Sequence, residues 1–170
     1  DRFARASGST VVAAMEGTRP LLVEVQALAA KASYGAPQRV STGLDHKRLS
    51  LLLAVLEKRA GMPFGSLDVF LNVVGGLRLA ETSGDLAVAA ALASSVYDRP
   101  APADAVFIGE LGLGGEVRPV GQMERRLAEA ARMGFVAAYV APRAVPRTVP
   151  AGIRIVETED VRALVRHAFT

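Results

Sequence analysis

The sequence predicts an α+β fold, with β-hairpins and βα units arranged around one buried central helix. Three observations lead to this mixed α/β class. Strand-like and helical stretches alternate along most of the chain, and a hairpin pattern dominates its first third. Residues 86–93 combine small and aliphatic side chains, which suits a helix covered on all sides. We expect one domain over residues 9–170, because a chain with 51% hydrophobic content can bury a single core of this size.

The first elements are a hairpin, a strand and a helix. Residues 10–16 and 21–29 are rich in β-forming residues, and the turn signal Gly-Thr-Arg-Pro joins them. Residues 38–43 form a third predicted strand. Asp45 then provides an N-cap for a helix over 46–60, which has leucines at helical spacing and is followed by glycine and proline.

The approach to the central helix contains two more predicted strands, at 67–74 and 77–79. Thr82 and Asp85 have the spacing of a capping box, in which each side chain bonds to backbone amides of the first turn. This interpretation makes Ser83 the first residue of the helix.

The second half alternates strands and helices around a glycine-rich segment. Residues 105–108 read as a short strand. Residues 109–121 lack both a Gly-Lys-Ser/Thr ending and a full dinucleotide fingerprint, so we interpret them as tight β-turns rather than a nucleotide loop. Two helices and two strands complete the prediction, at 122–133, 159–169, 135–141 and 153–156.

Composition excludes several classes of function. No apolar run approaches the roughly 18 to 20 residues of a membrane span. The absence of cysteine excludes disulfides and thiol chemistry, and the separated His46 and His167 predict no metal cluster. We expect a cytoplasmic protein that has no membrane partner. Since the first residue is not methionine, we expect a piece of a longer chain, with residues 1–8 as a tail or linker.

Basic residues are concentrated in one segment. The net charge is +3, yet between Lys31 and Arg59 there are six basic residues and two acidic ones. Such a segment suits phosphate backbones or acidic partners, although solvated side chains give the same pattern. Lys47 and Arg48 lie in a first helical turn, where the helix dipole disfavours cations. Either Asp45 alone compensates them, or Arg48 and Arg39 point at an anion such as a nucleic-acid phosphate.

Ser83 has two interpretations. A serine at a helix N-terminus after a strand is a place for a hydrolase nucleophile, because free amides there can stabilise an oxyanion. Serine and threonine are also enriched at helix starts for capping alone, which is the structural interpretation of Thr82, Ser83 and Asp85.

Four stretches together carry a resemblance to a known family. Over residues 9 to about 168 the chain resembles the C-terminal domain of the RadA (Sms) family of bacterial DNA repair proteins, which in turn resembles the proteolytic domain of Lon proteases. The stretches are residues 16–28, 39–49, 68–76 and 109–119. The resemblance implies a Lon-like fold.

The Lon family uses a Ser-Lys dyad, and the resemblance places its serine at Ser83 and its lysine at Arg126. Arginine stays protonated at physiological pH and cannot act as the general base. Asp85 and Ile108 also stand where Lon-type sequences have glycine and threonine. The dyad is therefore predicted to be degenerate, with an Arg126–Asp85 contact as its structural replacement, and we expect no catalytic residue and no metal ligand in this chain.

The resemblance implies a scaffold domain of a branch-migration ATPase. The expected partners are single-stranded or branched DNA, further copies of the chain in a hexameric ring, and a RecA-type recombinase. Arg39, Arg48, Arg78 and Lys47 are the predicted DNA contacts. ATP, Mg²⁺ and Zn²⁺ are expected only in domains that precede this one. A residual serine peptidase and a ring tier without DNA contact remain alternatives.

Overall fold

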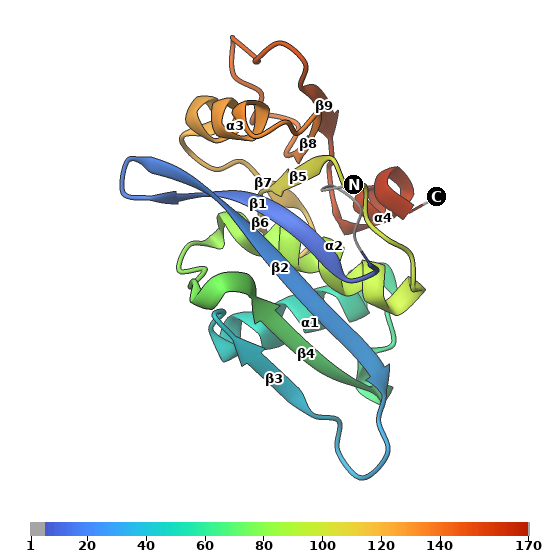
Figure 1. The fold of residues 1–170 in the computed structure, drawn as a ribbon. Coiled ribbons are helices and arrows are strands. Elements are labelled where there is room, and N and C mark those ends of the chain that lie inside the picture. The colour runs from blue at the N-terminus through green and yellow to red at the C-terminus, as the bar shows by residue number, and fades with distance from the viewer. Residues whose placement is uncertain (1–5, 170) are drawn as a thin grey trace.

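The computed structural model describes residues 6–169 and shows a mixed α/β arrangement. A four-stranded sheet has the order β1 (Ser9–Glu16), β2 (Arg19–Lys31), β4 (Leu67–Val73) and β3 (Arg39–Thr42). Neighbouring strands are antiparallel except β3 and β4, which are parallel because a helix connects them. β2 crosses the molecule diagonally in Figure 1 and pairs with β1 on one side and β4 on the other.

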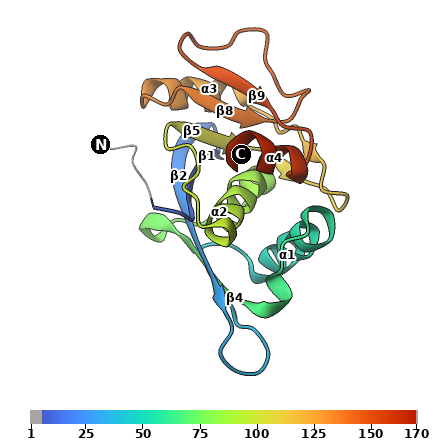
Figure 2. The ribbon, with the colours of Figure 1, turned by 90° about the vertical axis from the view of Figure 1, so that its right-hand side faces the viewer.

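Two helices lie on the same face of this sheet. α1 (His46–Ala60) and α2 (Asp85–Tyr97) pack against it, as Figure 2 shows. The alternation expected of a half-covered sheet is clear in β2, where Val23, Val25 and Ala27 are buried and Leu28 is exposed. On the opposite face of β2, β4 and β3 the side chains of Leu28, Phe70 and Val40 are exposed.

A second, parallel sheet forms the other end of the molecule. Its order is β5 (Ala105–Ile108), β8 (Ala137–Val140) and β9 (Arg154–Glu157). α3 (Met123–Arg132) makes the crossover between β5 and β8. The short hairpin β6 (Glu110–Leu111) and β7 (Val117–Arg118) lies between β5 and α3, and α4 (Val161–Phe169) follows β9.

α2 is the buried helix predicted from the sequence. All residues from Asp85 to Ser94 are buried, and its alanines have no exposed surface. It contacts β1, β2 and β5 as well as α1 and α4. Small side chains allow strands and helices to approach from every direction, which an ordinary amphipathic helix would not permit.

Helix α1 has the predicted bounds, and Asp45 caps it by accepting a hydrogen bond from the Arg48 amide at 3.2 Å. The glycine-rich segment forms the β6–β7 hairpin, which confirms tight turns. Residues 1–5 of the predicted linker lie outside the described residues. The end of that segment is tied to the core, because the Gly8 amide donates to Ser94 Oγ at 2.7 Å.

Two local predictions are wrong. Thr82 and Asp85 do not form a capping box: residues Thr82–Gly84 make a 3₁₀ turn, and α2 begins at Asp85 behind a Gly84 N-cap that has no side chain. Ser83 is therefore in that turn and not in the helix. Residues 77–79 are no strand either, apart from an isolated bridge between Leu79 and Leu44. In both places backbone hydrogen bonds to distant residues help to fix the chain: the Gly109 amide donates to the Ser83 carbonyl, and the Leu79 amide donates to the Gly43 carbonyl.

None of the helices in residues 6–169 combines the length and apolar character needed to cross a bilayer.

Candidate functional site

Ser83 lies in the turn just before the N-terminus of α2 and is only 2% exposed. The 3₁₀ turn holds it against the end of β5, since the Gly109 amide donates to the Ser83 carbonyl at 3.0 Å and the Leu86 amide donates to the Gly109 carbonyl at 3.0 Å. The side chain faces inward, toward α3 and β1. A serine in this position is shielded from water and depends on its neighbours for hydrogen bonds.

Arg126 reaches Ser83 from the first turns of α3 and is 4% exposed. Its Nη1 donates to Ser83 Oγ at 3.0 Å, to Glu81 Oε1 at 2.7 Å and to the Ala13 carbonyl at 2.9 Å. Its Nε donates to the Gly121 carbonyl at 2.9 Å. Every one of these partners is an acceptor, so the guanidinium stays charged and cannot receive a proton.

Glu81 completes the cluster, and the sequence analysis did not single it out. Its Oε1 accepts hydrogen bonds from Ser83 Oγ, from Arg126 and, at 3.1 Å, from the Met15 amide. Burial alone would raise the pKa of the Glu81 carboxyl, but the bonds from Arg126, Ser83 and Met15 outweigh it and hold that pKa below its usual value. A carboxylate with a lowered pKa is a weak base toward a serine hydroxyl.

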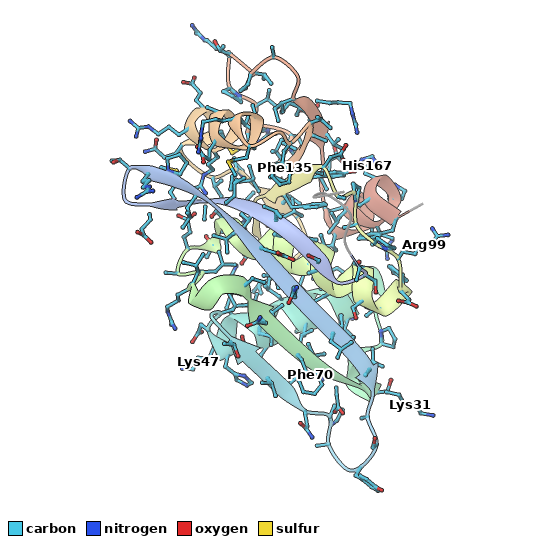
Figure 3. The ribbon with its side chains drawn as sticks, in the orientation of Figure 1. Lys31, Lys47, Phe70, Arg99, Phe135 and His167 are labelled. Carbon is cyan, nitrogen blue, oxygen red and sulfur yellow. The ribbon has the colours of Figure 1, made fainter. Side chains whose placement is uncertain are left out.

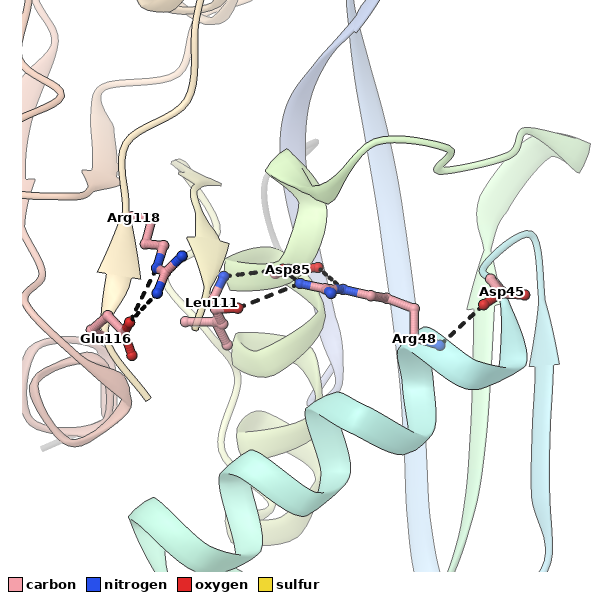
Figure 4. Close-up of polar contacts among 6 residues, drawn as sticks. All are labelled: Asp45, Arg48, Asp85, Leu111, Glu116 and Arg118. Carbon is pink, nitrogen blue, oxygen red and sulfur yellow. Dashed lines mark hydrogen bonds and ion pairs between the residues drawn. The ribbon is translucent and has the colours of Figure 1, made fainter. Parts of the chain in front are cut away.

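A second ion pair joins the partly exposed Arg48 of α1 to the buried Asp85 at the start of α2 (Figure 4). Asp85, 2% exposed, accepts from Arg48 Nε at 3.0 Å, from Arg48 Nη2 and from the Leu111 amide at 3.0 Å. Burial raises the pKa of the Asp85 carboxyl, and the bonds from Arg48 and Leu111 offset part of that rise. The hydrogen bonds to Asp85 raise the pKa of the Arg48 guanidinium.

The Arg126–Asp85 contact predicted from the sequence is therefore wrong. Arg126 pairs with Glu81, and Asp85 pairs with Arg48, because α1 presents Arg48 directly to the head of α2. This pairing also answers why a cation occupies the first turn of α1: Asp85 supplies the negative charge that Asp45 alone would have had to provide.

The four predicted DNA contacts have different surroundings. Arg39 is half-buried and donates to the backbone carbonyls of Leu67, Phe64 and Gln38, so it fastens the β3 end to the α1–β4 connection. Arg48 is 24% exposed and engaged with Asp85. Only two of the four, Lys47 and Arg78, are exposed.

Lys47 and Arg78 belong to adjoining segments. The Leu79 amide donates to the Gly43 carbonyl at 2.8 Å, and Leu79 bridges Leu44. Neither side chain has an ion-pair partner within residues 6–169. Lys47 projects outward at the start of α1 in Figure 3. We call Lys47 and Arg78 the basic corner.

A family comparison decides the affiliation of the chain. Residues 23–144 match the sequence model of a protein family described as subunit ChlI of Mg-chelatase. The chain belongs to this family. The matched range includes Ser83, Arg126, both ion pairs and the basic corner.

The chain is also similar to DNA repair proteins named RadA, which confirms the resemblance drawn from the sequence. RadA of Escherichia coli K12 is 50% identical over 149 residues, covering 88% of this chain and 32% of that protein. RadA of Bacillus subtilis is 47% identical over 168 residues (98% and 36%), and that of Streptococcus pneumoniae is 44% identical over 170 residues (99% and 40%). The chain spans about a third of the length of these relatives.

In this ChlI-family chain, sequence reasoning found Ser83 and Arg126 but missed Glu81. The signal that could have found it is charge balance, because an arginine placed on the buried face of an amphipathic helix requires a nearby carboxylate. Glu81, two residues before the serine, is the acidic residue on the same turn. All buried side-chain nitrogen and oxygen atoms within the described part of the chain have hydrogen-bond partners. Ser83 and Arg126 are buried, whereas the Glu81 side chain is 35% exposed at the edge of the cluster.

Proposed function

We propose that this chain is a non-catalytic scaffold domain of a RadA-type DNA repair and recombination ATPase. In this proposal it has the Lon-like fold, forms one tier of a hexameric ring and contacts DNA at the basic corner. The similarity to RadA proteins over 88 to 99% of the chain supports the repair role. ATP hydrolysis, Mg²⁺ and Zn²⁺ binding, branch migration and contact with a RecA-type recombinase would belong to the whole protein in the cytoplasm.

The observation that carries the non-catalytic part is the buried, hydrogen-bonded position of Ser83. A serine nucleophile needs a neutral base and an open face toward the substrate. Ser83 Oγ instead lies between a guanidinium that cannot accept a proton and a carboxylate that the guanidinium keeps weakly basic. Asp85, the first residue of α2, places a further carboxyl group two residues from Ser83, and its Arg48 partner is engaged with that carboxyl group rather than with the serine.

The absence of peptidase activity has a direct test. Incubation with a fluorophosphonate probe and with unfolded casein should give neither labelling nor cleavage at a pH between about 6 and 9, where a poised general base would act. An active Lon protease assayed in parallel is the positive control. Labelling that disappears in a Ser83→Ala variant would establish the alternative, a residual serine peptidase.

The DNA-contact part rests on the basic corner rather than on all four predicted residues. Lys47 and Arg78 are exposed and lie on adjoining segments, so a strand passing this corner could meet both. Arg39 and Arg48 donate to internal acceptors, and in the proposal they hold the corner in place. The engagement of these two arginines favours a second candidate, a ring tier without DNA contact.

A titration of labelled single-stranded DNA with the chain separates the two candidates. Lys47→Glu/Arg78→Glu should weaken binding and lower the salt dependence, by about 0.7 in the logarithmic slope for each phosphate that is no longer neutralised. Arg143→Glu/Arg147→Glu changes the charge equally on an exposed loop after β8 and should leave affinity within about twofold, because it lies away from the proposed DNA path. Light scattering reports the assembly state of each variant in the same solutions. If both double variants weaken DNA binding equally, the basic corner is not the contact, and the ring tier without DNA contact is the remaining candidate.

A further inference from the structure

The glycine-rich turn between β6 and β7 packs against the end of α1 and the start of α4. The Gly115 carbonyl accepts from the Val161 amide at 2.9 Å. Gly115 has φ +83°, and a Cβ there would lie 3.0 Å from Arg59 Cβ and 3.1 Å from Val161 Cγ2. Only glycine allows this close approach, which brings three segments distant in sequence to one place.

A surface pocket of about 280 Å³ forms where these segments meet. Its lining consists of Lys58, Arg59, Gly114, Asp160, Val161 and Arg162. Three of these residues are cationic and one is anionic. The pocket lies at the opposite end of α1 from the basic corner, about 16 Å along the helix axis from Lys47 to Lys58.

Both guanidinium groups are anchored by one edge. Arg59 Nε donates to the Leu113 carbonyl at 3.3 Å, and Arg162 Nε donates to the Arg59 carbonyl at 2.9 Å. The Nη atoms of the two arginines have no partner within residues 6–169. Anchoring by Nε fixes the orientation of a guanidinium while leaving its outer donors available for a ligand.

The nearby carboxylates are engaged through some of their oxygen atoms, and with Asp160 counted the lining has three cationic side chains against one anionic. Asp160 Oδ1 caps α4 by accepting from the Ala163 amide at 2.8 Å. Glu116 pairs with Arg118 and accepts from the Gly114 amide at 3.0 Å. The dipole at the C-terminus of α1 favours positive charge at this place, but it makes no hydrogen bond with the outer N–H groups of the two arginines. The pocket therefore combines excess positive charge with unused, oriented donors.

We propose that this pocket binds a phosphate group, with Arg59 and Arg162 donating from their Nη atoms and Lys58 adding positive charge. Arginine forks match phosphate oxygens in geometry as well as charge. The phosphate could be a phosphodiester of DNA, in which case the inference rests on the proposed function and extends the DNA path along α1. Alternatively it is a free phosphate or a phosphorylated small molecule.

The first test titrates the ¹⁵N-labelled chain with inorganic phosphate at constant ionic strength. The amide signals of Gly114 and Val161 should shift in a saturable way. Arg59→Gln/Arg162→Gln should weaken this binding at least about tenfold, whereas the matched Arg143→Gln/Arg147→Gln should not change it. Arg162→Lys keeps the positive charge and removes the guanidinium fork, so its phosphate affinity should lie between those of the two double variants. Because this substitution is conservative, it also provides a readout if the double pocket variant fails to fold.

The second test uses labelled single-stranded DNA and the same variants. A reduction of DNA affinity by about threefold or more in Arg59→Gln/Arg162→Gln identifies a phosphodiester as the ligand, while phosphate binding without any effect on DNA identifies a free phosphate source. If the pocket variant changes neither titration, the phosphate site is overturned. The basic corner is judged separately, because only Lys47→Glu/Arg78→Glu reports on it.

Discussion

Replacing Arg126 by methionine probes the centre of the candidate site. Methionine keeps much of the volume of the arginine side chain in the core but removes all of its N–H donors. Glu81 would lose its ion-pair partner, and Ser83 Oγ and the Ala13 carbonyl would each lose a hydrogen bond. Since Arg126 is 4% exposed, water cannot readily replace those donors.

The expected decrease in stability is about 4 kcal/mol. Removing one partner of a buried ion pair typically costs about 3 to 5 kcal/mol. Because the Glu81 side chain is 35% exposed, water re-solvates part of the carboxylate and the lower end of this range applies. The unsatisfied Ala13 carbonyl adds about 1 kcal/mol. For a chain of this length the midpoint temperature should fall by about 8 to 16 °C.

Urea denaturation followed by circular dichroism measures this difference, and Arg132→Met is the matched control. Arg132 lies on the same helix and pairs with Glu129, but it is 69% exposed and should contribute less than about 1 kcal/mol. Adding Glu81→Gln to Arg126→Met should recover part of the stability, because no unpaired charge remains. Equal destabilisation by Arg126→Met and Arg132→Met would refute the reasoning.

Three further outcomes follow from single features of the fold. The pKa of Glu81 is lower in the folded than in the unfolded chain, so its ionised carboxylate stabilises the fold at neutral pH. This contribution is lost as the pH falls below about 4.3, the unfolded value, and through the folded-state pKa. Glu81→Gln should therefore flatten the acid limb of a curve of unfolding free energy against pH. Gly43→Ala should lower the free energy of unfolding by more than about 2 kcal/mol in urea denaturation, since φ is +85° and the new Cβ would lie 2.6 Å from the Leu77 carbonyl oxygen. The control is Gly17→Ala, which also has a positive φ but open space around it, and it should cost about 1 kcal/mol. Gln122→Gly should raise the midpoint temperature, because Gln122 is the N-cap residue before α3 and has φ +64° without a side-chain cap bond. A lower midpoint would contradict this.

Sequence patterns predicted the parts of the fold that local rules control. The bounds of α1 follow from the Asp45 cap and the left-handed Gly61 at its end, and the burial of α2 follows from its uniform run of small side chains. The approach to α2 was harder, because a capping-box spacing at Thr82 competes with contacts from distant residues, such as the Leu111 amide 26 positions beyond Asp85. Local spacing does not reveal those contacts.

The site was predicted in its components but not in its pairing. The resemblance to the Lon dyad directed attention to Ser83 and Arg126, yet assigning Arg126 to Asp85 overlooked that Arg48 approaches Asp85 from α1. Basic residues look alike in a sequence whether they are solvated or buried. Arg48 pairs with a carboxylate 37 positions away, so only the packing of α1 against α2 distinguishes it from Lys47.

The pairing of Glu81 with Arg126 limits how the proposed scaffold could acquire peptidase chemistry by mutation. A single change of Arg126 to lysine would restore the residue type of the Lon dyad but not its chemistry. Beside the Glu81 carboxylate a lysine would be stabilised as ammonium, and its pKa would rise when a general base requires it to fall. A change to peptidase chemistry would require at least two coordinated substitutions. Removing Glu81 alone leaves the buried Arg126 without its ion-pair partner, and removing Arg126 alone leaves the partly exposed Glu81 without its own. In the proposed scaffold, the ion pair therefore opposes a change to serine–lysine chemistry by any single substitution.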